Sequence, residues 1–275
     1  MSDFEGFVET NGARIWAQAA GDGPGVVLVH AGIADARMWD PQWSALAAGH
    51  RVVRYDCRGF GRTDTDDVAF SNRADLVAVM DATGVDRAVL VGCSRAGSIV
   101  IDTALEYPDR VAGIAWVCGG LSGSEVEDTP EELAMFERGE ALVQVKDWAG
   151  LADLDVAIWI DGVGQPAGRA PAAVRDLVRT MCLETYEQEK VEGQPIVLDP
   201  PALERLGEIR VPVLAISGDL DMAATAIVAG QLVAAIPGAR RIDLPGVSHL
   251  PSLERPEWFT ETLLGFLAEV TATDA

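Results

Sequence analysis

The sequence predicts an α/β fold in which a mostly parallel sheet is covered by helices on both faces and carries an inserted helical cap. Short apolar segments alternate with helix-like segments in the first part of the chain, and this alternation stops between about residues 121 and 208 before it resumes. Strands that alternate with helices are typical of parallel sheets. We therefore expect a core formed by residues 1–120 and 209–275, with residues 121–208 as the cap.

The first half of the chain contains six predicted strands. Two of them flank an Asn11-Gly12 pair, which is typical of the tight turn of a hairpin. The run from Val26 to His30 is short and apolar, as expected for a strand buried inside a parallel sheet. The predicted strands are 7–10, 13–19, 26–30, 51–56, 88–92 and 111–117.

Helices are expected between these strands and after them. The helix over 71–84 has the clearest ends, because Ser71 is a good N-cap and Gly84 a good C-terminal stop. In the cap, Thr129 precedes a proline and two glutamates, which favour a helix N-terminus. The other predicted helices are 38–48, 95–107, 225–236 and 256–270, and the last two strands are 211–217 and 240–244.

The composition argues against several kinds of partner. The 275 residues carry a formal net charge of −22, and 49% of them are hydrophobic. A surface this negative repels nucleic-acid phosphates and anionic lipids, so we expect neither as a partner. No apolar run reaches the roughly 18 residues that span a bilayer, and the N-terminus lacks the basic start of a signal peptide. The four cysteines have no metal-binding spacing, so we expect free thiols in a cytoplasmic protein.

A serine at a strand-to-helix turn is the strongest candidate for chemistry. Ser94 lies in the segment Gly92–Ala96 (GCSRA), after a predicted strand and before a helix. Such a turn projects the hydroxyl above the edge of the sheet and needs small residues two positions to either side, which Gly92 and Ala96 provide. The alternative is a helix N-cap serine with a purely structural role.

A serine nucleophile needs a general base, and the chain has three histidines. His249 follows the last predicted strand, at the edge where an open α/β sheet builds its site. We expect His30 to brace the loop that carries Gly32, and we assign no role to His50.

The base in turn needs a carboxylate that fixes its tautomer and stabilises its cation. Asp219 and Asp221 both follow the strand predicted over 211–217. We expect Asp221 to be this acid, with Asp219 as the alternative, and the residue not used would be a turn aspartate bonded to its own backbone.

Five segments resemble, in the same order, motifs of the α/β-hydrolase superfamily. The nucleophile elbow differs from the usual G-x-S-x-G only at Ala96, where the superfamily has glycine. The order serine, aspartate, histidine is also the one that this superfamily uses. The other four are 29–32 (VHAG), similar to the His-Gly-x oxyanion loop, 56–64 (DCRGFGRTD), similar to D-x-R-G-x-G-x-S-D, 218–221 (GDLD), similar to G-x-x-D, and 246–249 (GVSH), similar to the catalytic histidine loop.

The resemblance implies the α/β-hydrolase fold and a serine hydrolase that cleaves a small-molecule carboxylic ester or lactone through Ser94, His249 and Asp221 and an acyl-enzyme. It also implies that the backbone N–H groups of Gly32 and Arg95 form the oxyanion hole, and that no metal or organic cofactor is needed. Within the superfamily, the pattern is most similar to the enol-lactonase and small-ester hydrolase group.

Other functions of the same fold remain open. A non-catalytic ligand-binding protein can keep the hydrolase pocket and its triad. A cofactor-free haloperoxidase or perhydrolase would also keep the triad. Carbon–carbon bond hydrolases share it too, but their oxyanion loop usually continues as His-Gly-x-Gly-Pro-Gly, where this chain has Ile33 and Ala34 after Gly32.

We expect the cap to select the substrate. Candidates for an apolar pocket are the bulky residues Ile33, Trp148, Trp159, Met181 and Tyr186. The alternative for such residues is packing inside the cap. Two arginines near the predicted oxyanion region, Arg37 and Arg95, are candidates either to bind a substrate carboxylate or to form surface ion pairs.

Overall fold

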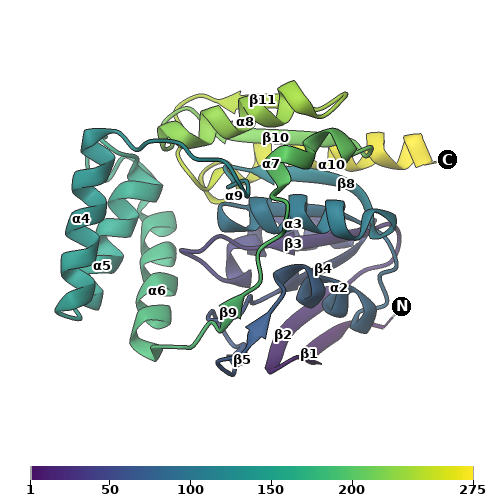
Figure 1. Cartoon of the computed structure of the whole chain (residues 1–275), viewed down its shortest axis with the longest axis horizontal. Coiled ribbons are helices and arrows are strands. Elements are labelled where there is room, and N and C mark those ends of the chain that lie inside the picture. Colours follow the sequence, from purple (N-terminus) through teal and green to yellow (C-terminus); the bar gives the residue numbers. More distant parts are fainter. Residues whose placement is uncertain (1, 275) are drawn as a thin grey trace.

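The central sheet follows the predicted alternation of strands and helices, and it is mostly parallel. The computed structural model describes residues 2–274 (Figure 1). The strands are β1 (Phe4–Thr10), β2 (Ala13–Ala20), β3 (Gly25–Val29), β4 (Arg51–Tyr55), β7 (Ala88–Cys93), β8 (Val111–Val117), β10 (Val213–Gly218) and β11 (Arg240–Leu244). They lie in the order β1-β2-β4-β3-β7-β8-β10-β11, and all pairs from β4 to β11 in this order are parallel.

The hairpin at the start of the chain has the predicted two-residue turn. β1 and β2 are antiparallel, and Thr10 pairs directly with Ala13. Gly12 has a φ of 67°, in the left-handed region that favours glycine. The short strand β5 (Asp64–Thr65) extends this edge by pairing with β2.

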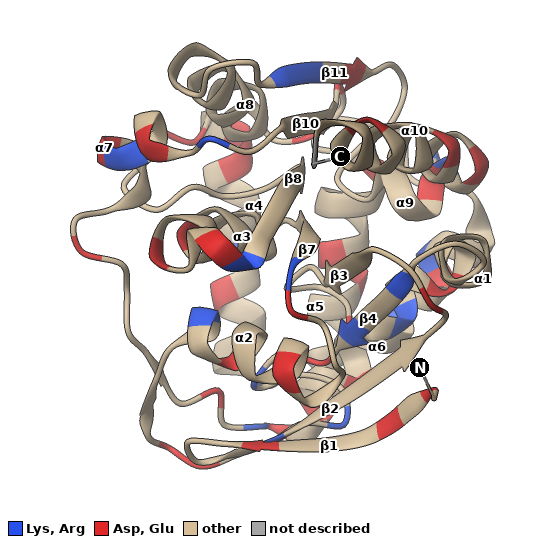
Figure 2. Cartoon of the chain, turned by 90° about the vertical axis from the view of Figure 1, so that its right-hand side faces the viewer, with Lys and Arg blue, Asp and Glu red and all other residues tan. Residues whose placement is uncertain are grey.

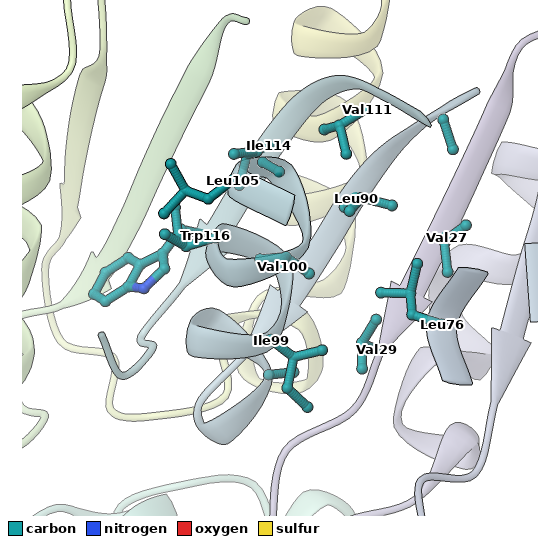
Figure 3. Packing of buried hydrophobic residues seen from close by; sticks show 14 of the residues in the cluster. Val27, Val29, Leu76, Leu90, Ile99, Val100, Leu105, Val111, Ile114 and Trp116 are labelled. Atoms are coloured by element: carbon teal, nitrogen blue, oxygen red, sulfur yellow. The ribbon is translucent and has the colours of Figure 1, made fainter. Parts of the chain in front are cut away.

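Helices cover both faces of the sheet, as predicted. They are α1 (Asp40–Ala47), α2 (Asn72–Ala82), α3 (Arg95–Glu106), α8 (Ala223–Ala235), α9 (Pro251–Glu254) and α10 (Pro256–Asp274), with short 3₁₀ turns η1 (Ala36–Trp39) and η2 (Pro108–Arg110). The alternation of side chains along β3 shows the two layers. Val27 and Val29 pack in one cluster with residues of α2 and α3 (Figure 3). Val26 and Leu28 pack in a second cluster with residues of α1 and α10.

Most element ends agree with the prediction, and one helix differs. The side chain of Ser71 caps α2 by accepting a hydrogen bond from the N–H of Ala74. The helix expected over 38–48 is instead a 3₁₀ turn, η1, followed by α1. Pro41 lies in the first turn of α1, and proline is compatible with a helix only at such a start because it has no N–H to donate.

Four helical segments between β8 and β10 stand to one side of the sheet (Figure 1). They are α4 (Pro130–Gln144), α5 (Trp148–Asp155), the π-helix η3 (Val156–Asp161) and α6 (Ala172–Gln188). Thr129 and Glu132 form a capping box that starts α4. The sequence pattern predicted helix in this region but not the π-helix.

The chain returns from α6 to the sheet along the core. β9 (Gln194–Pro195) pairs with β6 (Ala69–Phe70), which lies just before α2. Leu198, Ala202 and Leu206 are then buried in the same cluster as α2 and α3. Two short elements, α7 (Ala202–Arg205) and η4 (Leu206–Glu208), complete this return. We propose that residues 121–208 form the cap, with α4 to α6 as its helical part.

Acidic residues are spread over several elements, including α2, α3 and α10 (Figure 2). None of the helices in residues 2–274 combines the length and apolarity needed to cross a membrane.

Candidate active site

Ser94 occupies a strained turn between β7 and α3. Its φ and ψ are 57° and −123°, outside the regions that ordinary residues prefer. The backbone around it is fixed by hydrogen bonds. The N–H of Ser94 donates to the carbonyl of Val117 at 3.0 Å, and its own carbonyl accepts from Gly97 and Gly120 at 2.8 and 2.9 Å. The predicted strand–serine–helix arrangement is therefore present, with the serine held in one conformation.

The residues around Ser94 are packed closely. A Cβ added to Gly92 would lie 2.4 Å from the carbonyl oxygen of Ala96, and one added to Gly97 would lie 2.6 Å from the Cα of Gly119. Ala96 itself is fully buried. Glycine is thus required at 92 and 97, whereas position 96 has room for a methyl group, which explains why the turn departs from G-x-S-x-G at that residue.

His249 and Asp221 form a buried pair. The Nδ1 atom of His249 lies 2.8 and 2.9 Å from the two carboxylate oxygens of Asp221. An ionised carboxylate only accepts hydrogen bonds, so Nδ1 carries the proton and Nε2 is left with a lone pair. Asp221 also accepts from the N–H of Met222 at 2.8 Å. Asp219 accepts instead from the N–H of Gly246 at 2.7 Å, so it braces the histidine loop.

Ser94 and His249 line the same cavity of about 380 Å³. Both belong to loops that follow strands of the parallel sheet, at the edge where such sheets place their sites. The other lining residues come from both the core and the helical segments. They are Arg95, Ser98, Cys118, Gly119, Gly120, Leu121, Ser124, Val126, Asp128, Phe136, Trp159, Met222, Ala224, Thr225 and Val228.

The loop that follows β3 places Gly32 beside Arg95. A Cβ added to Gly32 would lie 3.4 Å from the Cδ of Arg95. His30 braces this loop, because its Nδ1 lies 2.8 Å from the carbonyl of Ala31 and its Nε2 accepts from the N–H of Cys57 at 2.9 Å. These two contacts hold the imidazole in place and give His30 a structural role.

Trp159, on the π-helix η3, contacts His249 in two ways. Its ring centroid lies 4.5 Å from that of the imidazole, and its backbone carbonyl accepts from the N–H of His249 at 3.1 Å. π-Helices are rare and often occur at functional sites, since the extra residue in the turn changes the direction of the side chains. Trp159 also contacts Phe136 of α4, with ring centroids 6.3 Å apart.

Of the five residues expected to line the pocket, only Trp159 is among the residues that line this cavity. Met181 is fully buried, and the hydroxyl of Tyr186 donates a hydrogen bond to the carboxylate of Asp155. Trp148 packs against Tyr186, with ring centroids 6.1 Å apart. The carbonyl of Ile33 accepts from the thiol of Cys182 in α6 at 3.2 Å. These four side chains build the interior of the helices and their contact with the core.

Among the lining residues that were not predicted from the sequence are Leu121, Val126, Phe136 and Met222. Met222 directly follows Asp221, so its proximity to the acid was a usable signal. Phe136 lies on a helix in which Glu132 alone is buried, so the apolar pattern gave no clear inward face.

Both candidate arginines have acidic partners within the chain. Arg95 pairs with Glu192 at 3.0 Å and stacks over the ring of Phe60. Arg37 pairs with Asp35 at 2.6 Å and with Glu184 of α6 at 2.5 Å. These contacts favour the ion-pair alternative over a substrate carboxylate.

Two buried thiols flank the His249–Asp221 pair. Burial, reinforced by the nearby charge of Asp221, raises the pKa of Cys118 and of Cys93, so both stay neutral. Cys118, Asp221 and His249 have potential ligand atoms within 4.8 Å of one another. Because Nδ1 of His249 is already bonded to both oxygens of Asp221, the histidine–aspartate pair accounts for this cluster.

The fold, the serine turn and the aspartate and histidine loops are together typical of one protein family. The Alpha/beta hydrolase family matches residues 26–262, and the chain belongs to it. The match covers the strained serine turn, the acid loop and the histidine loop.

Relatives and solved structures of this family resemble the chain over most of its length. A 2-hydroxy-6-oxononadienedioate/2-hydroxy-6-oxononatrienedioate hydrolase of Paraburkholderia phymatum is 30% identical over 81% of this chain and 78% of its own. The rhodomycin D methylesterase DauP of Streptomyces sp. strain C5 is 28% identical over 86% and 88%. The structure of the enol-lactonase from Burkholderia xenovorans LB400 has a TM-score of 0.72, with 25% identity over 93% of this chain and 97% of that one.

Proposed function

We propose that this hydrolase cleaves a small carboxylic ester or lactone through Ser94, His249 and Asp221. The observation that carries the proposal is the cavity shared by a strained serine and a histidine whose Nδ1 is held by a buried carboxylate. A weakly acidic hydroxyl becomes a useful nucleophile only beside such an oriented base.

The reaction uses the atoms of these side chains in two steps. Nε2 of His249 takes the proton of Ser94 Oγ, which attacks the substrate carbonyl carbon. The backbone N–H groups of Gly32 and Arg95 stabilise the oxyanion that forms. His249 then gives its proton to the leaving alcohol oxygen, which leaves an acyl-enzyme. Water, deprotonated by His249, attacks this acyl group, and Ser94 regains its proton as the carboxylic acid departs.

The names of the relatives cover several kinds of bond, and an ester or a lactone is among them. The methylesterase DauP and the enol-lactonase of B. xenovorans both act on acyl–oxygen bonds, as their names state. The hydrolase of P. phymatum is named for a different class of substrate. Here Ile33 and Ala34 follow Gly32 in place of the Gly-Pro-Gly that carbon–carbon hydrolases usually have, so the ester or lactone is favoured.

Active-site labelling tests the nucleophile. A fluorophosphonate should label the protein once, at Ser94, and Ser94→Ala should abolish both labelling and hydrolysis of a short-chain aryl ester. Ser98→Ala is the matched control, since Ser98 lines the same cavity one helical turn further along α3, and this variant should keep labelling and turnover. Labelling at another serine, or full turnover by Ser94→Ala, would contradict the proposal.

The same experiment separates the rival functions. A ligand-binding protein would turn over no ester or lactone of a substrate panel, even with its serine labelled. A carbon–carbon hydrolase would react at Ser94 but prefer a ring-cleavage dienoate to every ester. A perhydrolase would form peracid from the same acyl-enzyme when hydrogen peroxide replaces water.

A further inference from the structure

We propose that the groove between α4 and α5 is a second substrate compartment, which binds the distal apolar end of a long acyl chain. The inference rests on the proposed function, because it assigns the other end of that acyl group to Ser94. The substrates would then be neutral esters or lactones of medium- to long-chain acids.

The groove is a cavity of about 530 Å³ that adjoins the one containing Ser94. The two cavities share Asp128, Phe136 and Trp159 as lining residues. An acyl chain bound at Ser94 therefore has a path past these residues into the groove. The remaining lining residues are Leu133, Met135, Gly139, Glu140, Leu151, Leu154, Asp155 and Ile158.

The rings of Phe136 and Trp159 stand at the junction of the two cavities. Their centroids are 6.3 Å apart with an angle of 37° between the planes, and both side chains are only half-buried. Aromatic rings at this spacing contact each other, so a chain that enters the groove passes along their exposed sides and gains apolar contact with both. Because Trp159 also packs on His249, the entrance to the groove lies directly beside the base.

Gly139 leaves space in the groove because it has no side chain. It lies in the middle of α4, where glycine costs about 1 kcal/mol of helix stability relative to alanine. A Cβ there would meet Leu154 at 3.6 Å and Leu151 at 3.8 Å, which is ordinary contact. Packing therefore does not demand glycine, and a longer side chain at 139 would extend into the groove between α4 and α5.

The lining also indicates the charge of the chain end. Apart from the two aromatic rings and Gly139, the walls are leucine, isoleucine and methionine side chains, and the charged lining residues are the acids Asp128, Glu140 and Asp155. A terminal carboxylate would be repelled by these acids, whereas a methyl terminus would gain by leaving water. Each buried methylene is expected to raise kcat/KM by about fourfold.

Kinetics on aryl esters from acetate to decanoate test the compartment. The wild type should prefer the longer chains. Gly139→Leu should lower kcat/KM for decanoate about tenfold or more, which corresponds to two displaced methylenes, and leave acetate unchanged. Gly139→Ala should give an intermediate loss. Ala141→Leu is the matched control, since it adds the same side chain to an exposed position of α4 and should alter neither ester.

A binding measurement keeps this result separate from the proposed chemistry. Calorimetric titration with octanol should show binding to the wild type and to Ala141→Leu, and at least about tenfold weaker binding to Gly139→Leu, since the leucine displaces at least two buried methylenes. If acetate ester is not hydrolysed, the proposed function fails, while octanol binding still reports on the groove. A wild type without chain-length preference or octanol binding, or a normally melting Gly139→Leu with the wild-type profile, would overturn the compartment.

Discussion

The indole of Trp159 packs on the imidazole of His249, and the backbone carbonyl of the same tryptophan accepts the hydrogen bond of the histidine N–H. Trp159 lies at the junction of the two cavities, and it also holds the histidine loop from the side of the helices. In the proposed function, this one residue of the π-helix contributes both to substrate selection and to the position of the base.

Trp159→Ala should therefore change acyl-chain preference and also slow the chemistry. Loss of the indole widens the junction between the two cavities and removes the surface against which the imidazole rests. Activity toward a small activated ester should fall less than the discrimination between short and long chains. Trp159→Phe should restore much of both, because it keeps a ring at this position. Truncation of a large aromatic residue typically costs about 3–5 kcal/mol, so thermal melts must accompany the kinetics. Variants that melt normally and keep the wild-type order of preference would show that Trp159 does not select the substrate.

Asp221→Asn should lower kcat by orders of magnitude with the fold intact. An asparagine amide presents a donor to Nδ1 of His249 and favours the wrong tautomer, and the equivalent change in a serine protease costs about 10⁴-fold. Asp219→Asn should have a small effect, because its oxygen can still accept from Gly246. Steady-state kinetics and circular dichroism of both variants check this. If Asp219→Asn were the inactive variant, the acid would lie two residues earlier than we infer.

Ala96→Gly should keep substantial activity, and Ala96→Val should lose most of it. Position 96 is fully buried beside the serine turn, so two further methyl groups would overpack it. Overpacking typically costs about 1–3 kcal/mol and displaces the backbone. Gly92→Ala should be more damaging still, because its Cβ would lie 2.4 Å from a backbone oxygen. Ester kinetics and melting temperatures of the three variants test this order, and a fully active valine variant would refute it.

Glu132 should stabilise the protein in a pH-dependent way. Its carboxylate accepts from the N–H of Thr129 at 2.6 Å and from that of Ala223, at the start of α8, at 3.0 Å. Burial alone would raise its pKa, but these N–H groups outweigh that effect and lower the pKa below its ordinary value of 4.5.

A carboxylate with a lowered pKa contributes its full stability above the ordinary pKa and loses it as the pH falls through the folded value. At neutral pH, Glu132→Gln should lower the free energy of unfolding by about 1.5–3 kcal/mol, the worth of a hydrogen bond to a charged group. In acid below the folded pKa, the two proteins should become nearly equal. Urea unfolding at both pH values measures this, and a difference that grew in acid would contradict the assignment.

The four cysteines should be unreactive in the native protein. All are free and buried, and a raised pKa keeps Cys93 and Cys118 in the poorly nucleophilic thiol form. Ellman's reagent should therefore label no cysteine before unfolding and all four in denaturant. Rapid labelling of the folded protein would show that one of these thiols is accessible.

The sequence allowed the core to be predicted because its signals are local. The Asn11-Gly12 turn, the Ser71 cap and the run of short apolar strands each depend on a few neighbouring residues. The turn at Ser94 and the loops of Asp221 and His249 could be placed at one sheet edge because parallel strands all end there.

The pocket could not be predicted in the same way. Apolar residues such as Met181 and Phe136 look alike in sequence, although the first is buried inside the helices and the second lines a cavity. Which apolar residues become buried and which line a cavity depends on how α4, α5 and α6 pack against one another. This packing is a long-range property of the chain. The π-helix that directs Trp159 toward His249 has no comparable local signal.

Two hydrogen bonds join the helices to loops of the core. The N–H of His249 donates to the carbonyl of Trp159, and the N–H of Ala223 donates to the carboxylate of Glu132. These bonds limit how freely helices could be exchanged between relatives of this family. A chimera that joined this sheet to the helices of another hydrolase would lose a partner of the histidine loop and a partner of the segment that follows Asp221. Such a chimera would need a hydrogen-bond acceptor at each of these two places before its new pocket could be used. The smallest exchange that preserves both hydrogen bonds is therefore one that moves the π-helix and α4 together.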